Sequence, residues 1–295
     1  MTLEQLRIFL KVAGLEHVTR AAHALNMTQS AVSAAIQALE QRHGVVLFDR
    51  VGRGIVLTDA GRQFMPHAQA VLLRATEAEV FLTDLKGGVV GALRVQASQT
   101  VASYFLPPHL MRFHARYPNV LLQFGQGNTS SVVQSMLSGE ADVGVVEGVV
   151  DEPLLTVRPI ADDWLRVMVG RAHPWAARQS LSSEDLLQAD WVMREAGSGT
   201  RAAFDAALAE RGVRSDSLSV LLELPSNEAC IAAIETGNGA TVLSLRAAAP
   251  HIAQGLVVEA SFDLPVRTFS VLTHHDRHQS RAAAAFVAQM AQCNT

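Results

Sequence analysis

The sequence predicts an α/β protein that begins with an all-helical segment, and three features indicate it. Apolar residues recur at helical spacing between residues 3 and 44, in short segments separated by turns. A longer helical pattern runs from about residue 58 to residue 86, where two glycines end it. From residue 93 onward short apolar runs alternate with amphipathic helical stretches, which predicts a parallel-rich, doubly wound sheet.

The composition indicates a globular protein that is long enough for two or three domains. The chain has 295 residues, of which 49% are hydrophobic and 18% are charged. No apolar run approaches the roughly 20 residues of a membrane span, and no signal-peptide pattern is present, so we expect a cytoplasmic protein without membrane contact. Cys230 and Cys293 are isolated, which argues against both a disulfide framework and a zinc site and favours small packed side chains over redox sensors. We expect no cofactor.

The net charge of −4 is unevenly distributed along the chain. Residues 1–65 contain seven Lys or Arg against five Asp or Glu, a balance of +2, so the remainder is 17 − 23 = −6. A mildly basic N-terminal part on an acidic body fits a protein that contacts a polyanion with one end.

The first 44 residues predict three helices. Leu3, Leu6 and Phe9 mark an amphipathic first helix that ends at Gly14 and completes a core that two short helices could not form alone. Residues 19–44 then read as two helices joined by a polar turn at residues 26–28, the second beginning near Gln29. The small and polar face of this second helix suits the major groove of DNA, although an ordinary amphipathic hairpin would show the same periodicity.

A basic hairpin is predicted directly after these helices. Residues 45–48 and 55–57 form two short strand-like runs, and the segment between them carries Arg50 and Arg53 among glycines. Guanidinium groups and flexible backbone at the tip of such a hairpin, or wing, suit contacts with DNA phosphates. The helices and the wing together therefore indicate DNA binding more specifically than the helices or the wing alone.

These segments resemble the LysR-type transcriptional regulators. The matching residues include Ala21-Ala22-x-x-Leu25, Thr28-Gln29-Ser30-Ala31-Val32-Ser33, Gly44-Val45-x-Leu47-Phe48-Asp49-Arg50 and Leu57-Thr58-x-Ala60-Gly61. The resemblance implies a winged helix-turn-helix over residues 1–58 that binds double-stranded DNA. The expected DNA-binding residues are Thr28, Gln29, Ser30, Ser33, Gln37, Arg50 and Arg53. Many members carry arginine after the recognition-helix serine, where this chain has Ala34.

The long helix predicts a self-association surface. Positions 57, 61, 64, 68, 71, 75, 78, 82 and 85 alternate steps of four and three residues and are apolar or small, as in a heptad seam. Pro66 is tolerable near the first turn and otherwise predicts a bend. The seam either packs on the chain's own body or joins two chains. We expect a homodimer or homotetramer, because two DNA half-sites require two copies of the helix-turn-helix.

The part after Gly91 is similar to the effector domain of LysR regulators, which has the two-lobed form of a small periplasmic binding protein. We expect a linker helix over residues 59–88 and an effector-binding domain over residues 89–295. Lobe one is then about 89–161 with 266–295, and lobe two is about 162–265. The predicted elements include a helix over 101–117, a strand near 165–169 and a helix over 227–236.

Four polar clusters fall where predicted strands end or helices begin, which is where doubly wound sheets place ligands. Free N–H groups and hydroxyls at helix starts can bind an anion, although Ser, Thr and Asn there are also ordinary helix caps. Glu147, after a strand, could orient or exclude a ligand. The expected effector-binding residues are Ser98, Gln99, Thr100, Asn128, Thr129, Glu147, Ser198, Gly199, Thr200 and Asn227.

One cluster suggests the kind of effector. Residues 194–201, REAGSGTR, resemble a motif in the LysR subgroup of carbon-fixation and sulfur-assimilation regulators. The segment lacks the Gly-Lys-Ser/Thr ending of a phosphate loop. We expect a small anion, such as an oxyanion of sulfur or a compact carboxylate, because no run of aromatic residues suggests a flat ring.

Other functional classes receive less support. His274, His275 and His278 lack a cysteine or a second carboxylate nearby, so a solvated surface is favoured over a metal site. The sequence offers no nucleophile and base pair, which argues against an enzyme. A ligand-responsive regulator that influences RNA polymerase is therefore the leading hypothesis. A cytoplasmic solute-binding protein that has no DNA role is the alternative.

Overall fold

The computed structural model describes residues 1–51 and 54–292. The chain divides into two compact units, Met1–Leu82 and Thr83–Thr295. No helix within the described residues is both long enough and apolar enough to cross a membrane. Arg53, at the predicted wing tip, and Cys293 lie outside the described residues.

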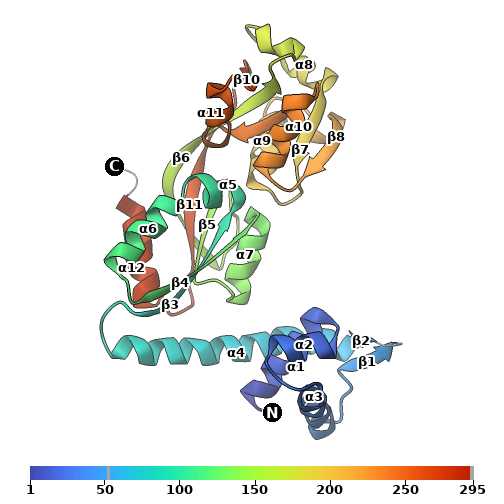
Figure 1. Cartoon of the computed structure of the whole chain (residues 1–295), viewed down its shortest axis with the longest axis vertical. Helices are drawn as coiled ribbons and strands as arrows, with labels where there is room; N and C mark the ends of the chain where they lie inside the picture. Colours follow the sequence, from blue (N-terminus) through green and yellow to red (C-terminus); the bar gives the residue numbers. More distant parts are fainter. Residues whose placement is uncertain (52–53, 293–295) are drawn as a thin grey trace. The chain divides into compact units, whose positions relative to one another are not determined.

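The first unit contains three short helices, α1 Leu3–Leu15, α2 Val18–Ala24 and α3 Gln29–His43 (Figure 1). Local caps set their limits. Thr28 Oγ1 accepts from the backbone N–H of Ala31 and so starts α3, while Asn26 adopts a φ of 53° in the turn before it. The helix-turn-helix geometry thus follows from residues close in sequence.

A two-stranded wing follows, formed by β1 Phe48–Val51 and β2 Gly54–Leu57, which pair antiparallel. The predicted strand over residues 45–48 is wrong except at its last residue. The carboxylate of Glu40 accepts hydrogen bonds from the N–H groups of Leu47 at 2.7 Å and Phe48 at 3.1 Å. These bonds hold the segment against α3, and the strand begins only at Phe48. Arg50 therefore lies within β1, opposite Ile55, and not at the tip.

The long helix α4 spans Asp59–Leu85 and contains Pro66. Gly61 permits its close approach to the wing segment, because an added Cβ would lie 2.2 Å from the carbonyl oxygen of Leu47. Further along the predicted seam, Leu82 is 61% exposed and Leu85 is 67% exposed. These two residues of the seam are therefore largely exposed among the described residues.

The second unit is built on a mixed sheet in the order β4-β3-β5-β11-β6-β9-β7-β8, with β10 paired to β6. Its strands are β3 Gly91–Ser98, β4 Val120–Gly127, β5 Val143–Glu147, β6 Leu155–Gly170, β7 Asp190–Arg194, β8 Ser219–Leu224, β9 Ala240–Ser244, β10 Val257–Ala260 and β11 Val266–His274. β3 pairs parallel with β4 and β5, and β7 pairs parallel with β8 and β9. The long strands β6 and β11 pair antiparallel, so the sheet is mixed where the sequence predicted a parallel-rich one.

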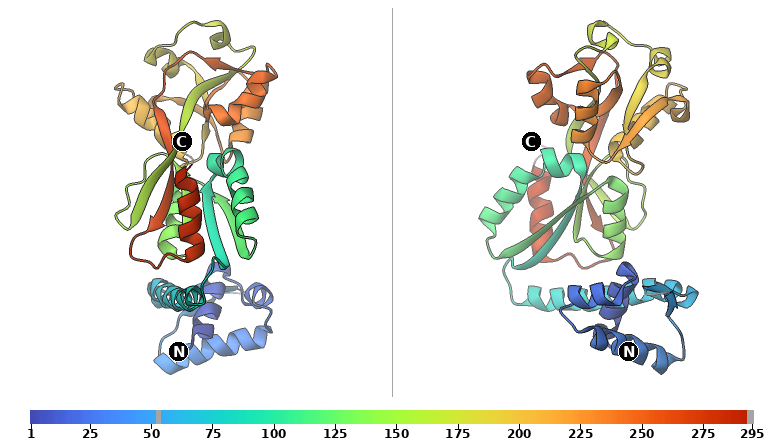
Figure 2. Two further views of the ribbon diagram at one scale, coloured as in Figure 1. Left: turned by 90° about the vertical axis from the view of Figure 1, so that its left-hand side faces the viewer. Right: turned by 45° about the vertical axis from the view of Figure 1, so that its right-hand side comes forward.

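Helices cover both faces of this sheet. They are α5 Gln99–Tyr104, α6 Pro107–Arg116, α7 Thr129–Ser138, α8 Ser183–Gln188, α9 Gly199–Ala209, α10 Asn227–Thr236, α11 Leu245–Ala253 and α12 Arg281–Ala291, with 3-10 turns η1 Pro174–Ala177 and η2 Ser215–Ser217. Figure 2 shows helices on both sides of the strands. Alternate residues of a strand point to opposite faces, so Val145 packs with residues of α5, α6 and α12, whereas Val146 packs with residues of α7. In the other half α9 covers one face, and α10 and α11 cover the opposite face.

Two hydrophobic cores divide the unit into two lobes. Ile160 and Phe269 belong to the core that we call the first lobe, whereas Leu165 and Leu264 belong to that of the second. The chain crosses between the lobes within β6 and again just before and along the start of β11. Because both crossings are extended and paired, they hold the lobes beside one another.

Some elements differ from the sequence prediction. The helix expected over residues 101–117 is two helices, α5 and α6, since Pro107 and Pro108 supply no N–H and disfavour helix in the preceding residue. The first half of β6, together with α8, α11 and β10, was not predicted. In α11 Pro250 obscured the helical pattern.

Candidate functional site

The outward face of α3 carries the predicted base-reading residues. Gln29 and Gln37 are exposed and Ser33 is half-buried, and with Arg50 of the wing they line one hollow of ≈ 420 Å³. Residues four apart in a helix share one face, so these three side chains form a row that a groove could meet. Thr28 and Ser30 lie at the start of this helix, where their hydroxyls are 3.1 Å apart. Thr28 therefore acts as a helix cap as well as lying beside the row.

The four predicted effector clusters occupy helix starts in the second unit, and three of them contain ordinary caps. Asn128 Oδ1 accepts the N–H of Ser131 at 2.9 Å, Ser198 Oγ accepts that of Thr200 at 3.2 Å, and Ser226 Oγ accepts that of Ala229 at 3.1 Å. Those oxygens stabilise helices, as the simpler interpretation of the sequence predicted. Ser98 is different, because its side chain caps nothing at the start of α5.

The hydroxyl of Ser98 donates instead to Glu147 Oε2, and both residues are buried. Thr129 Oγ1 donates to the carbonyl oxygen of Glu147 at 3.1 Å. Gly199, from the other lobe, approaches the same residue so closely that an added Cβ would lie 2.4 Å from the Glu147 carbonyl oxygen and 2.8 Å from its Cγ. Ser98, Thr129, Glu147 and Gly199 are thus brought together, as the sequence predicted for one ligand site.

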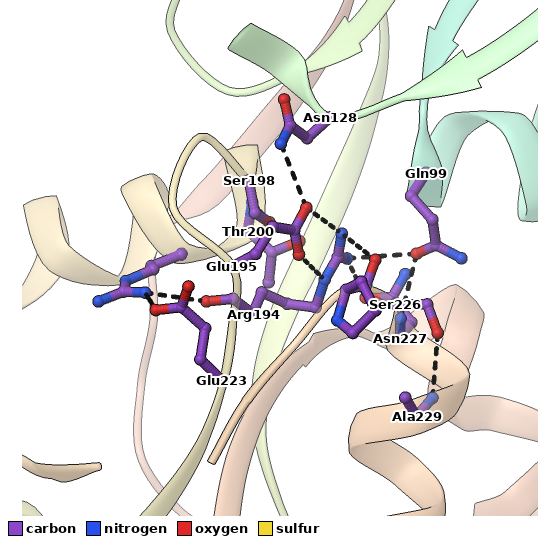
Figure 3. A network of polar contacts seen from close by, with 12 residues as sticks. Gln99, Asn128, Arg194, Glu195, Ser198, Thr200, Glu223, Ser226, Asn227 and Ala229 are labelled. Carbon is purple, nitrogen blue, oxygen red and sulfur yellow. Dashed lines mark hydrogen bonds and ion pairs between the residues drawn. The ribbon is translucent and has the colours of Figure 1, made fainter. Parts of the chain in front are cut away.

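Gln99, Thr100 and Asn227 form a second group across the lobes. Figure 3 shows Gln99 and Asn227 of this group beside Arg194. Asn227 Nδ2 donates to Thr100 Oγ1 at 3.0 Å, and the backbone N–H of Asn227 donates to Gln99 Oε1 at 3.2 Å. Arg194 Nη1 donates both to Gln99 Oε1 at 3.2 Å and to Asn227 Oδ1 at 2.9 Å. The buried guanidinium group of Arg194 therefore joins Gln99 to Asn227, and Asn227 in turn bonds to Thr100.

Glu195 extends this group toward Asn128 (Figure 3). Arg194 Nε donates to Glu195 Oε2 at 2.9 Å and Nη2 to Oε1 at 3.0 Å, which neutralises an arginine whose side chain is only 2% exposed. Asn128 Nδ2 reaches Glu195 Oε1 at 3.4 Å, and the N–H of Ser130 donates to the carbonyl oxygen of Gly197 at 3.2 Å. The lobes therefore meet at this point through polar contacts.

Tyr104 and Glu228 complete the network between α5 and α10. The Tyr104 hydroxyl donates to Glu228 Oε1 at 2.7 Å, and Gln99 Nε2 donates to Glu228 Oε2 at 2.8 Å. Burial, followed by the bond to Glu228, raises the pKa of Tyr104. Burial also raises the pKa of Glu228, but hydrogen bonds from Tyr104, its own backbone N–H, Ser226 and Gln99 outweigh that effect and lower the pKa overall.

Thr200 faces a buried ion pair at the start of β11. Arg267 Nε donates to Asp163 Oδ2 at 2.8 Å, and Nη1 donates to Thr200 Oγ1 at 2.9 Å. Ser244 donates to Asp163 Oδ1 at 2.6 Å, and Arg246 Nε lies 3.5 Å from the same oxygen. Thr200 is therefore linked to the crossing strands and to neither Thr100 nor Asn227.

Sequence reasoning selected Glu147 but missed most of the other ionisable side chains of this site. They are Tyr104, Asp163, Arg194, Glu195, Glu228 and Arg267. Arg194 and Glu195 stand inside the REAGSGTR motif and could have been selected with it. Nothing local marks Arg267 or Tyr104, because their partners are more than 60 residues away in sequence.

The described residues contain neither a cluster of metal ligands nor a reactive thiol. In the described ranges no group of three or more His, Cys, Asp or Glu could hold a metal ion. His275 Nε2 lies 3.1 Å from Asp276, and His278 Nε2 lies 2.8 Å from Asp84. Burial raises the pKa of the Cys230 thiol to about 11, so this side chain remains protonated and unreactive near neutral pH.

Two family models together match nearly the whole chain. Residues 3–62 match the bacterial regulatory helix-turn-helix protein, lysR family, and residues 86–293 match the LysR substrate binding domain. A relative in Cyanophora paradoxa, a probable RuBisCO transcriptional regulator, is 33% identical over 290 residues, which cover 97% of this chain and 90% of the relative.

Two solved structures have a similar fold. Full-length CbnR complexed with its target DNA gives a TM-score of 0.71 at 22% identity, covering 99% of this chain and 100% of that one. The regulatory domain of CcmR from Synechocystis PCC6803, in complex with 2-PG, gives a TM-score of 0.63 at 28% identity, covering 70% of this chain and 98% of that one.

Proposed function

Because the chain belongs to the LysR family of transcriptional regulators, we propose that it couples DNA binding through α3 and the wing to a small anion bound between its lobes. The helix-turn-helix and the effector-binding domain of the family are both present. The proposal adds which residues perform each task and what chemical class the effector has. It assigns no catalytic step.

The DNA part of the proposal is supported by the row on α3. Gln29, Ser33 and Gln37 offer amides and a hydroxyl, which can bond to base edges, while Arg50 offers a charged donor for phosphate. Thr28 and Ser30 lie beside the row at the N-terminus of the helix, where backbone N–H groups also favour phosphate. We place the DNA-binding domain at residues 1–58 and the linker helix at residues 59–88.

The effector part rests on one observation, which is that polar and charged side chains hold the facing segments of the lobes together. The bonds of Gln99, Arg194 and Asn227, and the approach of Gly199 to Glu147, place donors and acceptors from both lobes within a few ångström of each other. Hydrogen bonds of this kind can be exchanged for bonds to a ligand at little net cost. The effector-binding domain is then residues 89–295.

A small anion accounts for the chemistry at the helix starts. Ser98, Thr100, Ser198 and Thr200 supply hydroxyls, and α9 and α10 present their N-terminal ends at the same level of the sheet. We favour an oxyanion of sulfur or a compact carboxylate. The complex of the CcmR regulatory domain with 2-PG supports a small-molecule effector for this fold.

The mechanism needs two assembly states that the effector binds with different affinity. We propose a homodimer or homotetramer joined through the exposed seam of α4, since Val71, Leu82 and Leu85 are exposed among the described residues. Closure of the lobes would then alter the separation of paired recognition helices, and with it DNA bending and access of RNA polymerase. A regulator of this kind works in the cytoplasm, where its DNA is.

Footprinting of the purified protein on the DNA that flanks its own gene tests the DNA-binding part of the proposal. We expect a protected region containing two half-sites separated by whole helical turns. A protein that binds no DNA at any salt concentration would instead be a solute-binding protein.

Calorimetry against sulfite, sulfate, phosphate and small carboxylates tests the effector part. We expect at least one of these anions to bind and to change the footprint. Tight binding of a neutral or aromatic compound, unaffected by Ser98→Ala and Thr200→Ala, would contradict the anion site.

A further inference from the structure

Arg267 has a donor that the protein does not use. Its side chain is 4% exposed, Nε donates to Asp163 and Nη1 donates to Thr200, but Nη2 has no hydrogen-bond partner among the described residues. A buried polar atom without a partner is uncommon and costs free energy, which makes it a marker for a ligand atom. Nη2 belongs to the same guanidinium group whose Nη1 donates to Thr200 in the first turn of α9.

The ion pair of Arg267 with Asp163 is shared with a second arginine. Asp163 is fully buried and is the carboxylate that pairs with Arg267. Arg246 shares that carboxylate at 3.5 Å, so two guanidinium groups face one acidic group. The hydroxyl of Ser244 also donates to Asp163, which uses another of its acceptor sites. Arg267 therefore keeps one cationic donor, Nη2, that no described residue accepts.

Glu147 lies on the same face of the sheet as Arg267. Glu147 on β5 is the register partner of Phe269 on β11, and Arg267 stands two residues before Phe269 in that strand. Residues two apart in a strand point to the same face, and so do directly opposed residues on neighbouring strands. The carboxylate of Glu147 and the guanidinium of Arg267 are thus diagonal neighbours, both buried.

The first turn of α9 covers both groups. Gly199 contacts Glu147, where no Cβ would fit, and the next residue, Thr200, holds Arg267 Nη1. We call Glu147, Gly199, Thr200 and Arg267 the α9 site. A ligand at this helix start would meet the unused donor of Arg267 and the carboxylate of Glu147. An ionised carboxylate can only accept hydrogen bonds.

We propose that the α9 site takes a small anion that also carries a hydroxyl group, with the anionic oxygen bound to Arg267 Nη2 and the hydroxyl donating to Glu147. The inference rests on the proposed effector function and narrows its ligand class. An anion without a proton to donate would place an oxygen against the Glu147 carboxylate, and the repulsion together with the missing bond would weaken its binding. Glu147 therefore selects hydroxy acids and protonated oxyanions.

Two matched pairs of probes test this selectivity by calorimetry on the full-length protein. Glycolate and acetate differ by one hydroxyl group, and near neutral pH phosphate retains a hydroxyl that sulfate lacks. We expect glycolate to bind at least about tenfold more tightly than acetate, and phosphate at least about tenfold more tightly than sulfate. Equal or tighter binding of acetate and sulfate, or no binding of any of the four probes, would overturn the proposal.

Substitutions assign the selectivity to its residues. Glu147→Gln supplies an amide that can donate as well as accept, so the preference for glycolate over acetate falls below about threefold and sulfate binding improves. Arg267→Gln weakens glycolate and phosphate alike, by at least about tenfold. Arg166→Gln and Glu259→Gln make the same chemical changes in an ion pair of β6 and β10, 2.7 Å long, and keep the wild-type preferences.

The results of DNA binding and of probe binding distinguish a failure of the ligand inference from a failure of the proposed function. Circular dichroism first establishes that each variant is folded, and the wild-type comparison of probes decides the question even where a variant fails to fold. Binding to DNA that flanks the gene is measured on the same preparation. If the DNA is bound while glycolate and acetate bind equally, the ligand inference fails and the regulator proposal stands. If no DNA is bound, the regulator proposal fails whatever the probes do.

Discussion

The hydroxyl of Tyr104 donates a 2.7 Å hydrogen bond to Glu228, which lies 124 residues further along the chain. Tyr104 ends α5 in the first lobe, and Glu228 lies in the first turn of α10 in the second. Gln99 donates to the same carboxylate at 2.8 Å. The carboxylate of Glu228 thus accepts two hydrogen bonds from the opposite lobe, and the strength of both bonds depends on its negative charge.

We expect Tyr104→Phe to lower the midpoint of urea unfolding near pH 7. The pKa of Tyr104 is raised, so the hydroxyl remains a donor, while the pKa of Glu228 lies below its ordinary value of 4.5. A carboxyl group whose pKa falls on folding stabilises the fold above its unfolded pKa, and this contribution is lost as the pH falls through the folded value. The difference between wild type and variant should therefore shrink below pH 4.5.

Tyr117→Phe is the matched control, since the described residues give the hydroxyl of Tyr117 no hydrogen bond. Its unfolding midpoint should follow that of wild type at every pH. A difference for Tyr104→Phe that persists unchanged in acid would show that the bond to Glu228 is not its cause.

Arg194→Met should lower the free energy of unfolding by about 1–3 kcal/mol, because Glu195, Gln99 and Asn227 all lose a donor at a buried position. Urea titration followed by circular dichroism measures the loss. Arg214→Met removes an arginine whose side chain is 80% exposed and paired with Asp216, and it should leave the stability almost unchanged. Equal losses in the two variants would contradict a structural role for Arg194 in joining the lobes.

Gln29→Ala should weaken binding to the specific operator by about 1–3 kcal/mol and binding to random DNA very little, because an amide that reads a base edge contributes only at the correct sequence. Fluorescence anisotropy with both duplexes measures the two affinities. Gln63→Ala, an exposed glutamine of α4, should change neither. A loss of equal size on both duplexes would mean that Gln29 contacts only the backbone.

Arg50→Ala should weaken binding to both duplexes, because a phosphate contact carries no sequence information. The slope of log affinity against log salt concentration should become shallower by about one. Titrations at several salt concentrations give this slope. Arg74→Ala, a substitution at an exposed arginine of α4, should leave the slope as in wild type. An unchanged slope for Arg50→Ala would place this side chain away from phosphate.

Leu82→Glu should dissociate the assembly, because a charge at an apolar contact between chains costs about 3–5 kcal/mol when it is buried without a partner. Leu82 is 61% exposed within one chain, so the fold itself should tolerate the change. Light scattering should show a halved mass, together with lost operator binding. Ala70→Glu, an exposed position off the seam, should keep the wild-type mass. If Leu82→Glu also kept that mass, the subunit contact would lie elsewhere.

The sequence alone determined those features whose causes are local. α10 spans Asn227–Thr236 as predicted, and α3 begins at Gln29, because a capping side chain and a helical apolar pattern both act within a few residues. The family prediction, which was made for the whole chain and rested most strongly on motifs of the first 61 residues, is confirmed. Ser98, Thr129, Glu147 and Gly199 could also be selected together, because strand ends and helix starts gather at one edge of an α/β sheet.

Only the tertiary structure decided the features that depend on distant partners. The predicted strand at residues 45–47 is replaced by a segment bound to the Glu40 carboxylate. The first half of β6, which was not predicted, pairs with β11. Arg267 and Tyr104 join the site through bonds to residues 67 and 124 positions away. A charged side chain in a sequence carries no sign of whether it will be buried or what it will face, since burial and pairing are set by how the whole chain packs.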